Sequence, residues 1–115
     1  MISKEEVELF LSRFNQKVKV FGLLFRDDRG KNIQTLLELE ITPKYREDII
    51  THLGPDDYVD GPVEDTLYKV GEMWIFGKEV KGREVYIKIS MGMNNSGAIC
   101  ISFHIAERHI RYKFK

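Results

Sequence analysis

The sequence predicts one α+β domain in which N-terminal helices pack on a small antiparallel sheet. Apolar residues recur at helical spacing in the first half of the chain, and three strand-like segments follow one another in the second half. A chain of 115 residues has room for one domain with one core, so we expect residues 1–115 to form a single domain.

The first element should be an amphipathic helix that begins after Ser3. Ser3 and Glu6 have the spacing of a capping box, in which each side chain accepts a hydrogen bond from the backbone of the other residue. We expect the helix to end near Asn15 and a strand to follow over residues 18–22, where valines alternate with lysines. The apolar stripe of the helix, at i, i+3, i+4 and i+7, comprises Val7, Phe10, Leu11 and Phe14.

Two short helices should follow a charged turn over residues 26–30. Asn32 is a candidate N-cap for the first helix. Thr42 is a candidate N-cap for the second, because Pro43 then occupies the first helical position. The second helix should end at a Gly-Pro pair, residues 54–55. The apolar positions are Ile33, Leu36, Leu37 and Leu39 in the first helix and Ile49, Ile50 and Leu53 in the second.

Residues 56–71 predict a loop, because Asp, Gly, Pro and Thr mix there without a period. A connection of this length is either functional or flexible. Residues 81–82 and 93–97 then predict turns of two and five residues between strands, and the basic residues 108–115 predict a final strand or a short helix. The three strands joined by these turns should be Glu72–Val80, Arg83–Met91 and Ala98–His104.

Side-chain alternation predicts the register of the last two strands. Their apolar residues must share the core side, because a slip of one residue would expose both sets. With a five-residue turn, Tyr86 lies opposite His104 and Lys88 opposite Ser102. A phenol, an imidazole and an ammonium group should therefore meet on one polar face. The residues expected to be buried behind that face are Ile87, Ile89, Ile101 and Phe103.

The strand over Glu72–Val80 admits two arrangements. A regular pairing across the two-residue turn puts Lys78 on the core side, where its charge has to reach solvent at the end of the sheet. A bulge at Gly77 would return Lys78 to the polar face.

Composition narrows the classes of function. No apolar run approaches the ~18 residues that span a bilayer, and residues 1–6 lack the apolar core of a signal peptide, so we expect a cytoplasmic protein without a membrane partner. Cys100 is the single cysteine, and the three histidines lack ligand spacing, so neither a metal nor a cofactor is expected.

Charge is unevenly distributed although the net charge is zero. Residues 1–75 carry 10 basic and 15 acidic side chains, whereas residues 76–115 carry 8 and 3. The basic last third can attract a polyanion such as RNA locally.

Several segments, in this order, resemble the MqsR family of toxins from type II toxin–antitoxin systems. The resemblance covers roughly residues 18–104 and implies a fold similar to RelE-type toxins, cleavage of mRNA without metal by an endoribonuclease (an mRNA interferase), and a cognate antitoxin as partner. The segments are Ile49-Ile50-Thr51-His52-Leu53, Asp56-Asp57-Tyr58, Met73-Trp74-Ile75-Phe76-Gly77-Lys78, Glu84-Val85-Tyr86-Ile87-Lys88-Ile89 and Ile101-Ser102-Phe103-His104.

The resemblance also assigns expectations to single residues. A family position concerned with cleavage falls on Tyr86, and His104 stands where other members have lysine. The chain departs from the family at Asp60, near a family lysine, and at Ile75, where a polar amide can occur. Either Lys78 or Lys88 is a candidate to compensate for these departures.

Cleavage of RNA without metal explains why these residue types matter. A base removes the proton of the 2′-hydroxyl, an acid protonates the leaving 5′-oxygen, and cations stabilise the developing negative charge. Histidine can be either acid or base near neutral pH, and tyrosine can protonate an oxygen or stack on a base. The candidate catalytic residues are Tyr86, His104, Lys78 and Lys88, and the candidate RNA-binding residues are Arg83, Arg108 and Arg111.

The alternative function is a non-catalytic module that binds RNA or a protein on the same basic face. The departures at Asp60 and Ile75 favour it. A structural role without nucleic acid is a third hypothesis.

Overall fold

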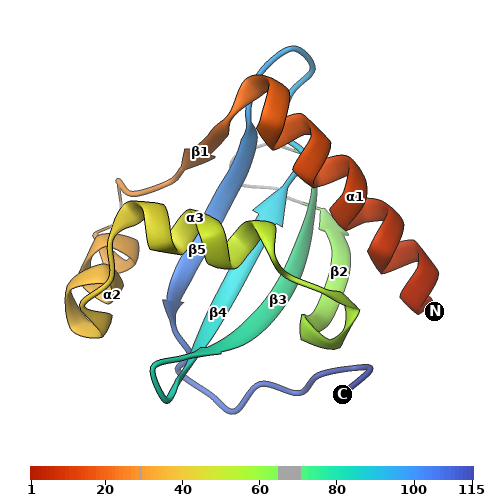
Figure 1. Ribbon diagram of the computed structural model, residues 1–115. Coiled ribbons are helices and arrows are strands. Elements are labelled where there is room, and N and C mark those ends of the chain that lie inside the picture. Colours follow the sequence, from red (N-terminus) through yellow and green to blue (C-terminus); the bar gives the residue numbers. More distant parts are fainter. Residues whose placement is uncertain (29, 65–70) are drawn as a thin grey trace.

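Helices cover one face of a mixed five-stranded sheet (Figure 1). The computed structural model describes residues 1–28, 30–64 and 71–115. The predicted α+β class is confirmed. The strands are, in spatial order, β1 (Leu23–Phe25), β5 (Ala98–Ile105), β4 (Arg83–Ser90), β3 (Glu72–Val80) and β2 (Tyr58–Glu64). Strand β1 is parallel to β5, and the other neighbouring pairs are antiparallel. We call the face away from the helices the outer face.

Helix α1 (Lys4–Phe21) begins as predicted. The Ser3 hydroxyl accepts a hydrogen bond from the N–H of Glu6, and the Glu6 carboxylate accepts one from the N–H of Ser3, so the capping box forms. The predicted apolar stripe is buried against the sheet, where Phe10 stacks on Trp74 at a centroid distance of 4.3 Å.

The end of α1 differs from the prediction. The helix runs six residues past Asn15, so the expected strand over residues 18–22 is wrong. Lys17 donates hydrogen bonds to two backbone carbonyls of the β4–β5 connection, which holds the last turns in place. The helix ends at Gly22, whose φ of 86° is accessible to glycine at little cost.

Two further helices follow β1: α2 (Lys31–Leu39) and α3 (Pro43–Thr51), with the short 3₁₀ turn η1 (Pro55–Asp57) leading into β2. Thr42 caps α3 as predicted, by accepting a hydrogen bond from the N–H of Tyr45. Asn32 does not cap α2, because Gly30 holds the N-cap position and Asn32 is the second residue of the helix, on its buried face.

Asn32 binds the edge of β5 instead. Its Nδ2 donates to the carbonyls of Arg26 and Ile101, at 2.8 and 3.2 Å, and its Oδ1 accepts from the N–H of Phe103 at 3.0 Å. Thr35 Oγ1 accepts a hydrogen bond from the N–H of Ile105, which lies further along the same edge of β5, at 3.3 Å. Strand β1 is too short to pair with this part of β5, so the two side chains of α2 satisfy its backbone groups.

The three predicted strands form, with β4 ending at Ser90 and β5 extending to Ile105. The fourth antiparallel strand, β2, lies inside the segment predicted to be a loop. Its pairing with β3 shifts register twice, so its sequence shows no strand period. Residues 65–70 of the expected loop lie outside the described residues.

The predicted register of β4 and β5 is correct for the residues of the polar face and wrong for the residues nearer the β4–β5 connection. Tyr86 pairs with His104, and Lys88 pairs with Ser102, as predicted. A shift then follows, so that Ile89 pairs with Cys100. Cys100 consequently lies in the main core, whereas Ile101 is buried as expected but outside that core. Ile101 belongs to a second apolar cluster, which it forms with Met73 and Ile99.

Strands β3 and β4 pair without interruption through the Lys81–Gly82 turn, so the bulge considered at Gly77 does not occur. Of the two arrangements left open by the sequence, Lys78 adopts the one on the core side. Its ammonium group reaches the edge of the sheet, where it binds the Asp57 carboxylate at 3.3 Å.

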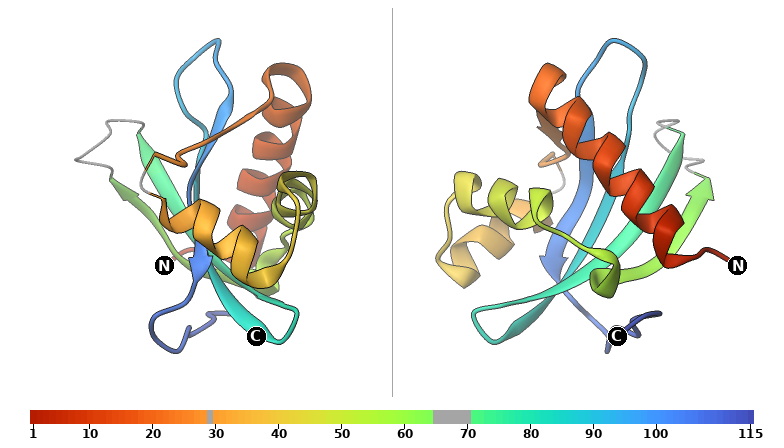
Figure 2. Two further views of the ribbon diagram at one scale, coloured as in Figure 1. Left: turned by 90° about the vertical axis from the view of Figure 1, so that its left-hand side faces the viewer. Right: turned by 45° about the vertical axis from the view of Figure 1, so that its right-hand side comes forward.

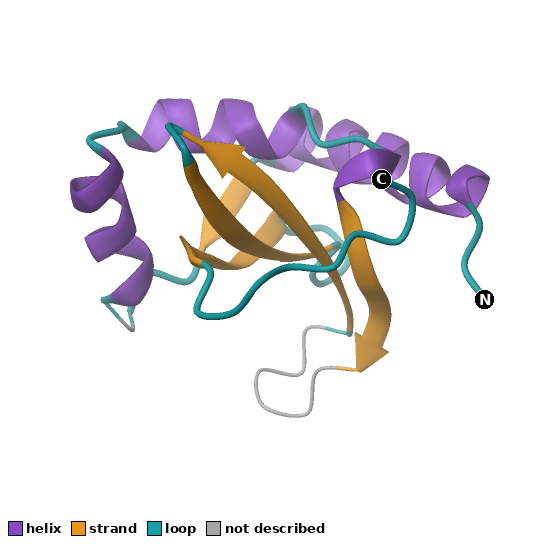
Figure 3. Cartoon of the chain, turned by 90° about the horizontal axis from the view of Figure 1, so that it is seen from below, coloured by secondary structure: helices purple, strands orange, loops and turns teal. Residues whose placement is uncertain are grey.

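Residues 106–115, which we call the tail, form neither the strand nor the short helix that was predicted. They are drawn as loop across the strands in Figure 3 and continue from the end of β5 in both views of Figure 2. Among the described residues, no helix is both long and apolar enough to cross a membrane.

Candidate functional site

A groove of about 600 Å³ lies on the outer face, between the tail and the strands β4 and β5. We call it the outer groove. Its polar side chains include Tyr86, Lys88, Ser102 and His104 from the strands and Arg108 and Arg111 from the tail. Five of the seven predicted site residues therefore line a single groove.

Tyr86 and His104 form a stacked pair at the floor of the outer groove. Their ring centroids are 5.2 Å apart, and the ring planes differ by 19°. His104 Nδ1 lies 3.1 Å from the carbonyl oxygen of Ile105. A carbonyl can only accept, so Nδ1 must carry a hydrogen, and Nε2 carries the lone pair when the ring is neutral. The imidazole therefore offers Nε2 for proton transfer.

The phenol of Tyr86 is a donor at neutral pH. Burial, and to a lesser extent the negative charge of Asp60, raise the pKa of Tyr86 above its usual value. Lys88 Nζ lies 5.8 Å from the centroid of the same ring. A proton donor, a proton acceptor and a cation are thus adjacent on two paired strands.

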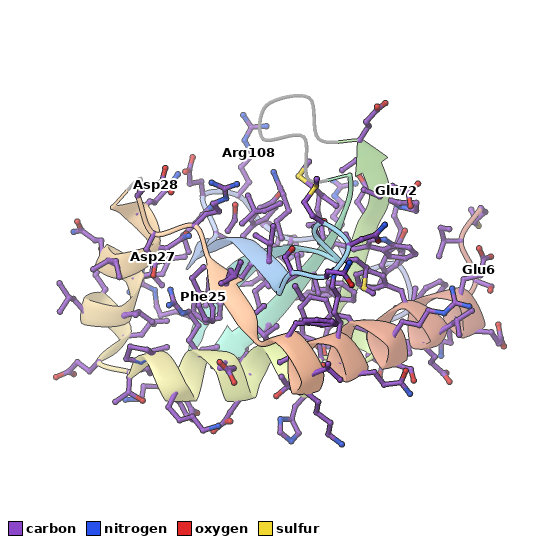
Figure 4. All side chains as sticks on the ribbon, turned by 90° about the horizontal axis from the view of Figure 1, so that it is seen from above. Glu6, Phe25, Asp27, Asp28, Glu72 and Arg108 are labelled. Carbon is purple, nitrogen blue, oxygen red and sulfur yellow. The ribbon has the colours of Figure 1, made fainter. Side chains whose placement is uncertain are left out.

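Positive charge surrounds this pair. Arg108 lies on the side of the sheet away from α1 (Figure 4) and lines the groove together with Arg111 and Lys88. Glu107 is the acidic residue of the groove wall, and it forms an ion pair with Lys31 of α2. The hydrogen bond from Lys31 and the positive charge of Lys31 lower the pKa of Glu107. Lys31 therefore offsets the negative charge of Glu107 at the groove wall.

Lys78 and Arg83 do not join the other candidates. Lys78 is bound to Asp57 on the helix side of the sheet. The alternation of β4 puts Arg83 on the same side as the buried Val85, next to the β3–β4 turn. Two of the seven predicted site residues are therefore on the opposite face from the Tyr86–His104 pair.

The two departures from the MqsR pattern lie on β3 and β2, in line with Lys88 on β4. Ile75 is the direct partner of Lys88 across β3 and β4, and Asp60 is the partner of Ile75 across β2 and β3. An acidic side chain therefore stands where some members of the family place a lysine, and an apolar one stands where a polar amide can occur. Lys88 is the lysine that lies near them.

Sequence reasoning missed the residues that hold the tail. Glu84 of β4 accepts hydrogen bonds from the tail, and Gly77 of β3 lies under it. The one available signal was a glycine inside a strand, which indicates close approach of another chain segment as well as a bulge.

Cys100 is not a candidate nucleophile. It is fully buried in the core, and burial raises the pKa of its thiol to about 12. Within the described part of the chain, no three His, Cys, Asp or Glu side chains gather as a metal site requires.

Comparison with known proteins found no family model that matches the chain, no matching curated protein and no matching solved structure.

Proposed function

We propose that this protein is the toxin of a type II toxin–antitoxin system, a metal-independent mRNA endoribonuclease that a cognate antitoxin inhibits. The observation that carries the proposal is the stacked Tyr86–His104 pair, which lies in one groove with Lys88, Arg108 and Arg111. The resemblance of the ordered sequence segments to the MqsR family supports it.

The chemistry uses the 2′-hydroxyl of the RNA as the nucleophile. Nε2 of neutral His104 takes the hydroxyl proton, and the 2′-oxygen attacks the adjacent phosphorus. The bond from phosphorus to the 5′-oxygen breaks, and Tyr86 gives its phenolic proton to that oxygen. The products are a 2′,3′-cyclic phosphate and a 5′-hydroxyl. His104 is left protonated and Tyr86 ionised, and transfer of one proton between them through solvent restores both groups.

The cations of the groove have two tasks in this scheme. Lys88 is next to the reacting pair and stabilises the negative charge that develops on the phosphoryl oxygens. Arg108 and Arg111 bind neighbouring phosphates of the strand. Lys78 has no part in the reaction, because it is on the other face of the sheet.

The proposal predicts that His104→Ala abolishes cutting and spares binding. We expect cleavage of a single-stranded RNA by purified protein to fall by ~10²–10⁴-fold, which is the usual contribution of a positioned proton-transfer group. Binding of the same RNA should change little, because Lys88, Arg108 and Arg111 remain. His52→Ala is the matched control, since His52 is exposed on the helix side, and its cleavage rate should equal that of the wild type.

Two outcomes would change the assignment. Undiminished cleavage by His104→Ala would remove this residue from the mechanism. A large loss in Tyr86→Phe supports proton transfer from the hydroxyl, whereas a small loss means that the ring only stacks on a base.

The alternative is a binding module that uses the same groove without cutting. The apolar Ile75 beside Lys88 and the acidic Asp60 one strand further away favour it, because they lessen the charge stabilisation available to the reaction. Tight, salt-sensitive RNA binding without any cutting by the wild type would select this alternative.

A further inference from the structure

The tail has no regular secondary structure, yet its course is determined by contacts. Ile110 is buried. The N–H of Lys113 donates to the carbonyl of Tyr58 at 3.1 Å, and the ring of Phe114 stacks on the ring of Tyr58 at a centroid distance of 5.6 Å. The tail therefore crosses the outer face from β5 to β2 and is attached at its far end.

Glu84 is the principal attachment point between those ends. Its backbone carbonyl accepts from the N–H of Ala106 at 2.8 Å. Its Oε1 accepts from the N–H of Ile110, and its Oε2 from the hydroxyl of Tyr112, both at 3.1 Å. Burial, followed by the hydrogen bond to the Glu84 carboxylate, raises the pKa of Tyr112 to about 12, so this hydroxyl remains a donor.

Gly77 provides the space in which the tail lies. It is on β3, directly opposite Tyr86 and one strand away from Glu84. A Cβ at this position would be 2.8 Å from Tyr112 Oη and 2.9 Å from Ile110 Cδ1. A side chain at residue 77 would therefore force the Tyr112 and Ile110 side chains, through which the tail is attached, to move.

These anchors determine where two arginines lie. Arg111 is exposed and lies between two anchored residues, Ile110 and Tyr112. Arg108 lies between Ala106 and Ile110, whose N–H groups both donate to Glu84. Both arginines line the outer groove. Apart from the ion pair between Glu107 and Lys31, these anchors are the described contacts before residue 113 that hold this part of the tail.

We propose that Glu84 and Gly77 are positioning residues that hold the tail as a strap across the outer face and thereby place Arg108 and Arg111 against the phosphates of single-stranded RNA. The proposal rests on the function proposed above. It makes a prediction contrary to simple electrostatics, because removing an acidic residue beside a polyanion site should by itself strengthen binding.

The test measures binding of full-length protein to a fluorescent single-stranded RNA with 2′-O-methyl groups, which cannot be cut, by anisotropy over a range of salt concentrations. Glu84→Ala should weaken binding roughly ten-fold and lower the slope of log K against log salt by about 1.4, as expected for two lost contacts with single-stranded phosphates. Glu79→Ala is the matched control. It removes the same charge from an exposed residue that is the cross-strand partner of Glu84, and its binding should be unchanged or tighter.

A double-mutant cycle separates positioning from a general loss of structure. In a protein that already carries Arg108→Ala and Arg111→Ala, the Glu84→Ala change should cost no further affinity. An additive loss would overturn the proposal. Gly77→Ala serves as the second variant because it leaves every charge in place, and it should reproduce the weaker binding and the lower salt slope of Glu84→Ala.

Amide hydrogen exchange supplies a readout that does not depend on RNA. The N–H groups of Ile110 and Lys113 should exchange faster in Glu84→Ala than in Glu79→Ala. Equal exchange in the two variants, or RNA binding by Glu84→Ala as tight as that of the wild type, would overturn the proposal. If the wild type does not bind RNA, the proposed function and the RNA contact of the arginines are both wrong. Amide hydrogen exchange alone would then decide whether Glu84 anchors the strap.

Discussion

Arg46 is a charged side chain in the interior, and its surroundings explain how the charge is tolerated. Its guanidinium donates to both carboxylate oxygens of Asp27, at 3.0 and 3.1 Å, and its Cζ lies 3.7 Å from the centroid of the Phe25 ring. The side chain is 3% exposed. A bidentate pair of this kind ties the connection between β1 and α2 to helix α3.

We predict that Arg46→Met destabilises the protein although methionine keeps an unbranched apolar side chain at this buried position. Loss of one partner of a fully buried pair costs about 3–5 kcal/mol, and the 29% exposure of Asp27 should reduce this to about 2–3 kcal/mol. Urea denaturation measures the change in the free energy of unfolding. The double variant with Asp27→Leu should recover part of the loss, and a single variant as stable as the wild type would show that the ion pair contributes nothing.

Single residues on the polar face could be predicted because their neighbours are set by local geometry. Strand alternation and the length of one turn are enough to pair Tyr86 with His104. The need for a glycine at residue 77 comes from Tyr112, and the place of the Lys78 ammonium group depends on Asp57. Both partners are distant in sequence. Local patterns contain no information about such partners, so the role of Gly77 was missed and the face of Lys78 was left open.

Elements were predicted well where their period was regular and poorly where tertiary contacts overrode it. The alternation over residues 18–22 covers too few positions to distinguish a strand from the end of a helix, and the contacts of Lys17 with the β4–β5 connection favour the helix. Strand β2 has two register shifts, which remove its period. In β5 the pairing with β4 shifts at Ile101, between Cys100 and Ser102. The carbonyl of Ile101 is also where Asn32 binds the edge of the strand.

At the scale of the strand, we predict that Asn32→Ala costs at least ~2 kcal/mol in the free energy of unfolding, because it leaves the N–H of Phe103 and the carbonyl of Ile101 buried without a partner. The measurement is urea denaturation. Gln34→Ala is the control, since Gln34 is exposed on the same helix and should change stability by no more than ~0.5 kcal/mol. Equal stabilities of the two variants would mean that the edge of β5 does not need the Asn32 side chain.

The whole molecule gathers several cations in one groove, so a net charge of zero is a poor guide to what its outer face can bind. The basic last third of the sequence contains β4, β5 and the tail, and it supplies the cations of the outer groove. The uneven charge was visible in the sequence. Its assembly into one groove was not, because that depends on the path of the tail.

The proposed toxin activity predicts a property of the living cell. Expression of the protein alone should arrest growth, and co-expression of the neighbouring gene should relieve the arrest if its product is an antitoxin that covers the basic groove with an acidic segment. Growth curves and colony counts measure both effects. The His104→Ala variant should be harmless at the same expression level, and a wild type that is harmless at high level would contradict the toxin proposal.

The parallel pairing of β1 with β5 has a consequence for the order of folding. Strands β3, β4 and β5 pair through short connections, whereas Leu23 must find Ala98 across most of the chain, and the entropy of closing so long a loop delays that contact. Helix α1 is made before any of the strands, yet Phe10 packs on Trp74 of β3. During synthesis the apolar stripe of α1 therefore remains without its partner until the C-terminal hairpins exist, and β1 docks on β5 only after that.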